Sequence, residues 1–320
     1  MTDLFLEYDA AAELVRRRVE TLLMTAPLPV RTYTAHLTKS QGKFIRARAV
    51  LACAMDREEK IHKDAVTFAA AIELLHLATL VHDDIMDEAA LRRGVLTLQK
   101  KYGKRTAVIC GDYLLVAAIK ELTAAQENDN YRRLDAAGYV GQICMGELRQ
   151  TVNSRNYNLG MFRYLSIING KTAALFEASY YAGALTAETD EKRLRLYRRL
   201  GRYTGVTFQL TDDCIDYETD QEAAGKSVQS DYAQGVITLP VIYTFRQEPE
   251  LKGQAEEGKL STHTLLEAVK NSGGVAYTHR TAKRYYEKAL KAMEELGLNG
   301  RKAEILKELL DKSFYGLAGR

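Results

Sequence analysis

Tryptophan is absent from the 320 residues, and proline occurs only four times. Because proline interrupts helices, its scarcity favours long helical segments. The net charge of +3 gives no bulk electrostatic case for binding nucleic acid or an anionic membrane surface. Any anionic ligand must therefore be held by local clusters of basic residues. The four cysteines are far apart and show neither the spacing of a zinc site nor a disulfide framework; they are Cys53, Cys110, Cys144 and Cys214.

The sequence also lacks the usual signals of export and membrane insertion. The first residues show no basic region, apolar run and cleavage site of a signal peptide. The longest apolar stretch, residues 65–81, is interrupted by Glu73 and His76 and is shorter than the roughly 20 residues of a membrane span. We therefore expect a cytoplasmic protein in a reducing compartment, with no membrane span.

Apolar residues instead recur three and four positions apart along most of the chain, which indicates amphipathic helices. No segment shows sustained strand alternation, and no linker or internal repeat divides the chain. We predict an all-α fold, a single domain over residues 1–320 with about ten or more helices. The first expected helix covers residues 3–24 and is ended by Pro27 and Pro29. The other expected helices are one beginning after Gly42, 62–87, 104–127, 130–150, 160–184, 189–219, one near Pro240, and two or three between 261 and 317.

Two acidic clusters with the same spacing stand out, residues 83–87 and 212–216, each reading Asp-Asp-x-x-Asp. On a helix the first and fifth positions share a face, about 6 Å apart along the axis. Each cluster therefore brings two carboxylates to one point, near the helix end at which the dipole disfavours negative charge. A hard cation such as Mg²⁺ would offset that cost, because its preferred ligands are oxygens.

Basic residues follow these clusters or precede them in short motifs. Arg92-Arg93-Gly94 comes after the first cluster, and Gly42-Lys43-x-x-Arg46 precedes it. Two further lysines, in Gly170-Lys171-Thr172 and Gly225-Lys226, each stand beside a glycine. Arginine and lysine bind phosphate, and Mg²⁺ on few carboxylates completes its shell with water and substrate phosphates. The combination points to a magnesium–phosphate ligand.

The order of these motifs, from about Gly42 to Pro240, resembles the trans-isoprenyl diphosphate synthases, most of all those that make medium and long chains. The resemblance implies an all-α bundle around a central cavity, usually a homodimer. It implies Mg²⁺-dependent head-to-tail condensation of isopentenyl diphosphate with an allylic prenyl diphosphate. Departure of the allylic diphosphate leaves a carbocation, which isopentenyl diphosphate captures before a proton is lost. Some long-chain members also require a second, non-identical subunit.

The resemblance assigns site residues position by position. The metal ligands it implies are Asp83, Asp87 and Asp212, with Asp84 and Asp216 assisting. The isopentenyl diphosphate site corresponds to Lys43, Arg46, His76 and Arg93. Groups that hold the allylic diphosphate and face the reacting centre correspond to Arg92, Lys171, Thr172, Gln209 and Lys226. No protein nucleophile is required.

Two positions depart from the family pattern. Val236 replaces a lysine that the family commonly has before Thr238-Leu239-Pro240. The first basic motif has Gln41 and Ala47 where a glycine and a proline are usual. The first departure removes a possible contact with the allylic diphosphate, and the second affects the shape of a binding loop.

Small residues at the positions four and five before the first aspartate bear on the length of the product. In the family, bulky aromatic residues there stop the chain short, whereas this sequence has Thr79 and Ala78. We therefore expect a product longer than farnesyl. Phe68, Ile72 and Leu75 form a hypothetical lower floor, although each is equally explained by core packing.

Other interpretations of the same residues remain open. A class I terpene cyclase shares the ionisation chemistry but normally lacks a second Asp-Asp-x-x-Asp. A regulatory subunit of a heteromeric prenyl synthase keeps the fold but loses the metal motifs, which are intact here. Glu73 and His76 also match the Glu-x-x-His pattern of di-iron bundles, with a second copy at Glu59 and His62. That pattern explains neither the aspartate clusters nor the basic motifs.

Overall fold

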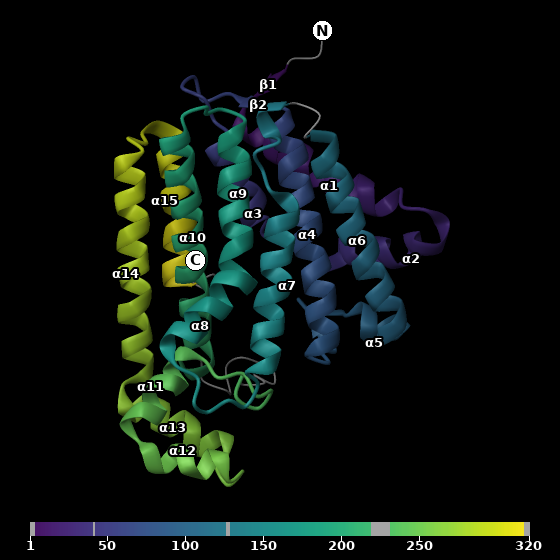
Figure 1. The fold of residues 1–320 in the computed structure, drawn as a ribbon. Coiled ribbons are helices and arrows are strands. Elements are labelled where there is room, and N and C mark those ends of the chain that lie inside the picture. The colour runs from purple at the N-terminus through teal and green to yellow at the C-terminus, as the bar shows by residue number, and fades with distance from the viewer. Residues whose placement is uncertain (1–3, 41, 126–128, 219–230, 317–320) are drawn as a thin grey trace. The chain divides into compact units, whose positions relative to one another are not determined.

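The computed structural model describes residues 4–40, 42–125, 129–218 and 231–316, apart from the side chain of Asp216. Helices account for most of these residues, which confirms the predicted all-α class (Figure 1). The α-helices are α1 (Tyr8–Met24), α2 (Leu28–Leu37), α3 (Ile45–Cys53), α4 (Asp64–Met86), α5 (Leu98–Tyr102), α6 (Lys104–Ala125), α7 (Ala136–Val152), α8 (Met161–Ile168), α9 (Ala174–Leu185), α10 (Glu191–Glu218), α11 (Leu239–Gln247), α12 (Pro249–Glu256), α13 (Thr262–Ser272), α14 (Gly274–Glu295) and α15 (Gly300–Tyr315).

Within the part of the chain that the structure describes, four two-residue strands form two small antiparallel ribbons. β1 (Phe5–Leu6) pairs with β2 (Ile61–His62), with Phe5 opposite His62. β3 (Leu91–Arg92) pairs with β4 (Val95–Leu96), with Arg92 opposite Val95. Two-residue strands are too short to show alternation, so the sequence pattern did not predict them.

The chain forms two compact units. Unit 1 comprises residues 1–136, 178–198 and 298–306, and unit 2 comprises 137–177, 199–297 and 307–320. The expectation of a single domain over the whole chain stays a prediction.

In unit 1, α4 is the central helix and packs against α1, α3 and α6. Its buried residues include Phe68, Leu74 and Ala78. By length and composition α4 is apolar enough to cross a membrane, although 61% of its most apolar window is buried inside the protein. A buried core helix passes the same test, so the observation is weak evidence for a membrane span.

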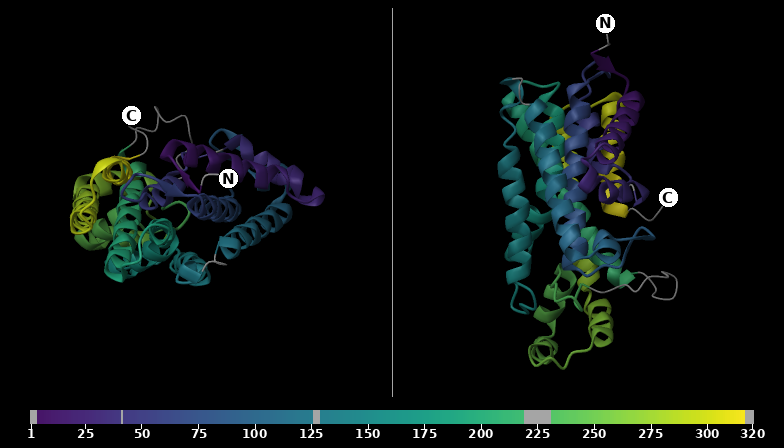
Figure 2. Two further views of the ribbon diagram at one scale, coloured as in Figure 1. Left: turned by 90° about the horizontal axis from the view of Figure 1, so that it is seen from above. Right: turned by 90° about the vertical axis from the view of Figure 1, so that its right-hand side faces the viewer.

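In unit 2, α11 packs against α12, α13 and α14. Figure 1 shows these helices near the first turns of α14, and the right view of Figure 2 shows them in green at the bottom of the picture. The glycine that begins α14 allows this packing, because a Cβ on Gly274 would lie 2.6 Å from the carbonyl oxygen of Pro240. The core of the unit is formed by apolar side chains such as Ile167, Val206, Leu210 and Phe245.

The structure differs from the predicted helices at several places, since α5 and α12 were not predicted and α7 begins at Ala136 instead of at residue 130. Pro27 and Pro29 were expected only to end the first helix, but they also begin α2, since proline is tolerated in a first helical turn. The predicted helix 160–184 is divided into α8, a π-helical segment (Asn169–Ala173) and α9. Such π segments are rare and occur often at functional sites.

Candidate active site

The first aspartate cluster lies at the end of α4, as the sequence predicted. Asp83 and Asp84 are in the last turn, and Asp87 is the C-cap residue, with its backbone N–H donating to the carbonyl of Asp83 at 2.8 Å. Asp83 and Asp87 are four residues apart on neighbouring turns. Asp84 differs from them because it is only 6% exposed.

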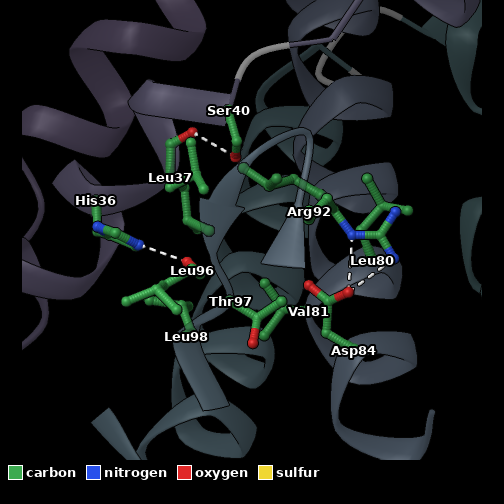
Figure 3. A pocket seen from close by; sticks show the side chains of 12 residues that line it. His36, Leu37, Ser40, Leu80, Val81, Asp84, Arg92, Leu96, Thr97 and Leu98 are labelled. Carbon is green, nitrogen blue, oxygen red and sulfur yellow. Dashed lines mark hydrogen bonds and ion pairs between the residues drawn. The ribbon is translucent and has the colours of Figure 1, made fainter. Parts of the chain in front are cut away.

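Asp84 is held by Arg92 in the β3–β4 ribbon. The Nε and Nη2 atoms of Arg92 both lie 2.8 Å from Oδ1 of Asp84 (Figure 3). Burial raises the pKa of Asp84, and the charge of Arg92 opposes that shift. A small cavity of about 20 Å³ lies beside the pair, with His36 among its lining residues. The second aspartate of the cluster thus binds a protein cation.

Arg93 is placed by the turn of the same ribbon. Arg93 and Gly94 both have positive φ, 52° and 78°, as a two-residue type I′ hairpin requires. The Nη1 atom of Arg93 donates to the carbonyl of Ser40 at 2.8 Å. A Cβ on Gly42 would lie 2.8 Å from that same nitrogen, so the guanidinium packs closely on the loop before α3. The turn therefore brings Arg93 to the Gly-Lys-x-x-Arg motif.

Arg46 and His76 are in direct contact within unit 1. Nη1 of Arg46 lies 3.2 Å from Nε2 of His76. Because a guanidinium only donates, Nε2 accepts and the imidazole proton is on Nδ1. Burial and the charges of Arg46, Arg93 and Arg92 hold the pKa of His76 well below 6.5. Burial also lowers the pKa of Arg46, to about 10.

Glu73, which lies three residues before His76 on α4, makes a contact that the sequence did not predict. Its Oε1 accepts the backbone N–H of Ala47 at 2.9 Å. Glu73 appeared in the sequence only within a Glu-x-x-His pattern, and nothing in that pattern indicates a partner on another helix. In the other copy of the pattern, Glu59 accepts the backbone N–H of Arg301, at the start of α15.

In unit 2, Lys171 and Thr172 lie in the π-helical segment. This segment approaches α7 so closely that a Cβ on Gly146 would lie 2.2 Å from the backbone nitrogen of Lys171. The ammonium of Lys171 forms an ion pair with Glu147 at 3.0 Å. The glycine in Gly-Lys-Thr also permits close packing, since a Cβ on Gly170 would lie 2.9 Å from the carbonyl of Gln142.

Thr172 begins a hydrogen-bonded chain that reaches the second aspartate cluster. Its hydroxyl donates to Oε1 of Gln209 at 2.6 Å, and Nε2 of Gln209 donates to Oδ1 of Asp213 at 2.8 Å. The hydroxyl of Tyr164 donates to Oδ2 of Asp213. An ionised carboxylate only accepts, so Asp213 fixes the orientation of the Gln209 amide and hence the direction of the Thr172 hydroxyl. Tyr164 was not predicted from the sequence, which offers no signal for it.

For the remaining predicted site residues, the structure gives only their position, their exposure or a single contact. Lys43 is exposed in the loop before α3, and Asp212 is exposed on α10. Ala78 is buried on α4, and the hydroxyl of Thr79 donates to the carbonyl of His76 at 2.8 Å. Lys226 lies outside the described residues, as does the side chain of Asp216.

An all-α chain with two aspartate-rich helices and basic residues beside them is typical of prenyltransferases that act on diphosphates. The sequence profile of the polyprenyl synthetase family matches residues 29–271. The chain belongs to this family, whose members are prenyltransferases of isoprenoid biosynthesis. The resemblance predicted from the motifs is therefore confirmed.

Relatives with known names support the assignment. Heptaprenyl diphosphate synthase component 2 of Geobacillus stearothermophilus is 32% identical over 303 residues, which cover 92% of each chain. The crystal structure of heptaprenyl diphosphate synthase from Staphylococcus aureus is similar at a TM-score of 0.88 and 30% identity, covering 97% of this chain and 99% of that one. A polyprenyl synthase from Caulobacter crescentus, complexed with calcium and isoprenyl diphosphate, has a TM-score of 0.85 and 29% identity, with coverage of 97% and 96%.

Proposed function

We propose that this protein is a Mg²⁺-dependent trans-prenyltransferase that condenses isopentenyl diphosphate head to tail with an allylic diphosphate. The observation that carries the proposal is the arrangement along α4 in unit 1. Arg46 and His76 are in contact there, and Arg92 binds the aspartate cluster at the end of the same helix. One helix thus carries the candidate metal ligands of the first cluster, and through His76 and Asp84 it contacts two arginines suited to a diphosphate.

The donor set fits magnesium. Asp83, Asp87 and Asp212 would hold the ions through oxygen atoms, which hard divalent cations prefer. Asp84 assists by holding Arg92, and Asp216 is proposed to assist from the second cluster. The Caulobacter crescentus relative, described with calcium and isoprenyl diphosphate, supports a hard cation in this family. Bound Mg²⁺ would supply charge neutralisation for the departing diphosphate.

The protein's own residues bind and orient the two substrates. Arg92 and Lys171 are proposed to hold the allylic diphosphate together with Lys226. Lys43, Arg46, Arg93 and His76 are proposed to bind isopentenyl diphosphate. Thr172 and Gln209 are proposed to face the reacting centre, in the orientation that Asp213 imposes. Fixed donors of this kind stabilise charge as it develops on the leaving group, because they need no reorganisation.

The product is proposed to be longer than farnesyl. Ala78 is a small buried residue on α4, about one turn before the aspartate cluster. The long-chain relatives support this length, since two of them are named heptaprenyl diphosphate synthases. Ala78→Phe should shorten the product, and Ala78→Leu should shorten it less. An unchanged product length in both variants would contradict the assignment of Ala78.

The oligomer is proposed to be a homodimer in the cytoplasm. The described residues of α6 support an interface, because Ile109, Val116 and Ile119 are exposed apolar side chains on one helix. The Geobacillus stearothermophilus relative is named as a second component, so a non-identical subunit is the alternative partner. Sedimentation of the purified chain tests the homodimer, and a monomer that gains activity with a second protein would favour the alternative.

The primary experiment is turnover of the purified protein with farnesyl diphosphate and labelled isopentenyl diphosphate, with and without a chelator. We expect a ladder of prenyl diphosphates that disappears when the metal is removed. Geranyl and geranylgeranyl diphosphate serve as alternative primers. If none of the three primers is elongated, the proposal fails for the chain alone. Cyclic hydrocarbon products would instead indicate a terpene cyclase.

A further inference from the structure

The start of α3 is stabilised by a residue of another helix. The first backbone N–H groups of a helix have no partner within the helix and need an acceptor. Phe44, the N-cap residue of α3, has a φ of 53° and provides no side-chain cap. Oε1 of Glu73, on α4, accepts the N–H of Ala47 at 2.9 Å. A carboxylate at a helix N-terminus is also favoured by the helix dipole.

Two arginines of unit 1 act on the same carboxylate. The charges of Arg46 and Arg93 act on Glu73 and oppose the rise in pKa that burial causes. Arg46 contacts His76, and His76 is one helical turn from Glu73. Arg93 is fixed in turn on the loop before α3 through the carbonyl of Ser40. Two guanidinium groups therefore share a region in which Glu73 supplies negative charge.

We infer that Glu73 is a positioning residue for the basic pair Arg46 and Arg93, and so sets the affinity for isopentenyl diphosphate. The inference rests on the proposed function of that pair. By binding the amide of Ala47, Glu73 fixes the turn of α3 that carries Arg46. Its charge also reduces the repulsion between Arg46 and Arg93 before an anionic ligand arrives, which keeps both donors in place.

Two substitutions separate the effect of the hydrogen bond to Ala47 from the effect of the negative charge of Glu73. Glu73→Gln keeps an oxygen that can accept the N–H of Ala47 but removes the charge. Glu73→Ala removes both. We expect the KM for isopentenyl diphosphate to rise about tenfold in Glu73→Gln and further in Glu73→Ala, as for loss of a charged hydrogen-bond partner. We expect kcat and the KM for the allylic substrate to change less than about threefold.

Glu188→Gln is the matched control. Glu188 also accepts backbone N–H groups, those of Thr189 and Asp190, and it is paired with Arg193. It belongs to unit 1 but to none of the proposed binding groups. We expect its substitution to lower thermal stability without raising the KM for isopentenyl diphosphate.

The outcomes distinguish the inference from the proposed function. Equal rises in both KM values, or a fall in kcat alone, would overturn the positioning role, as would unchanged kinetics in both Glu73 variants. If wild-type protein does not turn over, the proposed function fails. Direct calorimetric titration with isopentenyl diphosphate then decides the role of Glu73. Weaker binding in Glu73→Gln than in Glu188→Gln supports the role, and equal binding or no binding to wild type overturns it.

Discussion

The two aspartate clusters have the same sequence pattern but different surroundings. In α4 the second aspartate, Asp84, binds the guanidinium of Arg92. In α10 the second aspartate, Asp213, accepts hydrogen bonds from the neutral side chains of Tyr164 and Gln209. Both are buried, with 6% and 4% of their surfaces exposed. In each cluster the second carboxylate is thus held by protein donors.

The difference is electrostatic. Arg92 compensates one negative charge of the first cluster, whereas Tyr164 and Gln209 bind Asp213 through neutral groups. The first cluster also belongs to a unit in which Arg46, Arg93 and His76 interact. We infer that unit 1 responds to pH and to anionic ligands, and that the hydrogen-bonded chain of unit 2 maintains geometry.

The largest effect, on kcat, is expected at Asp83, the first position of the first aspartate cluster. Asp83→Asn removes a proposed metal ligand at nearly constant size, so kcat should fall about 10³-fold, as when charge stabilisation is lost. The Mg²⁺ concentration for half-maximal rate should rise. Asp129→Asn, in an exposed pair with Arg132, is the control and should keep wild-type kinetics. Wild-type metal dependence in Asp83→Asn would remove Asp83 from the metal site.

The next largest effect, on stability, is expected from removal of the cation that holds Asp84. Arg92→Gln leaves a buried carboxylate without its charged partner, and we expect a loss of about 2–3 kcal/mol in the free energy of unfolding. Because Arg92 is 31% exposed, this is less than for a fully buried pair. Urea denaturation measures it. Arg17→Gln, in an exposed pair with Glu13, should cost less than about 0.5 kcal/mol. Equal losses would show that Arg92 does not compensate Asp84.

A smaller effect is expected from the neutral partner of Asp213. Tyr164→Phe removes one hydrogen bond to a buried carboxylate and should cost about 1.5 kcal/mol of stability. Release of Asp213 loosens Gln209 and Thr172, so kcat should fall about tenfold. Steady-state kinetics and urea denaturation measure the two effects. If kcat stays unchanged while stability falls, Tyr164 supports the core and not the orientation of Thr172.

The smallest effect is a pH dependence confined to unit 1. The folded-state pKa of His76 lies well below 6.5, so below pH 6.5 the unfolded chain binds more protons at this residue. Stability should therefore fall as the pH decreases, by no more than about 1.4 kcal/mol per pH unit. In His76→Gln, the free energy of unfolding measured by urea denaturation should change less between pH 7.5 and 5.5 than it does in the wild type. His263→Gln, at an exposed position of α13, should have the same pH dependence of the unfolding free energy as the wild type. The same slope in both variants would exclude His76 as its source.

Helical periodicity and the scarcity of proline predicted the all-α fold, because these are local properties of the backbone. The same local properties predicted only the end of a helix at Pro27 and Pro29, but α2 begins there. It also missed the π-helical segment at Lys171. That geometry depends on close packing of Gly146 and Gly170, which lie on different helices.

By itself, the sequence determined the family, the two aspartate clusters and the basic motifs, because these depend only on the order and spacing of residues along the chain. Only the tertiary structure decided that Arg92 holds Asp84, that Tyr164 holds Asp213, and that Glu73 caps α3. Tyr164 is 49 residues from Asp213 in the sequence, and Ala47 is 26 residues from Glu73. Such pairs form only when separate helices pack together and bury polar groups, each of which then needs a partner.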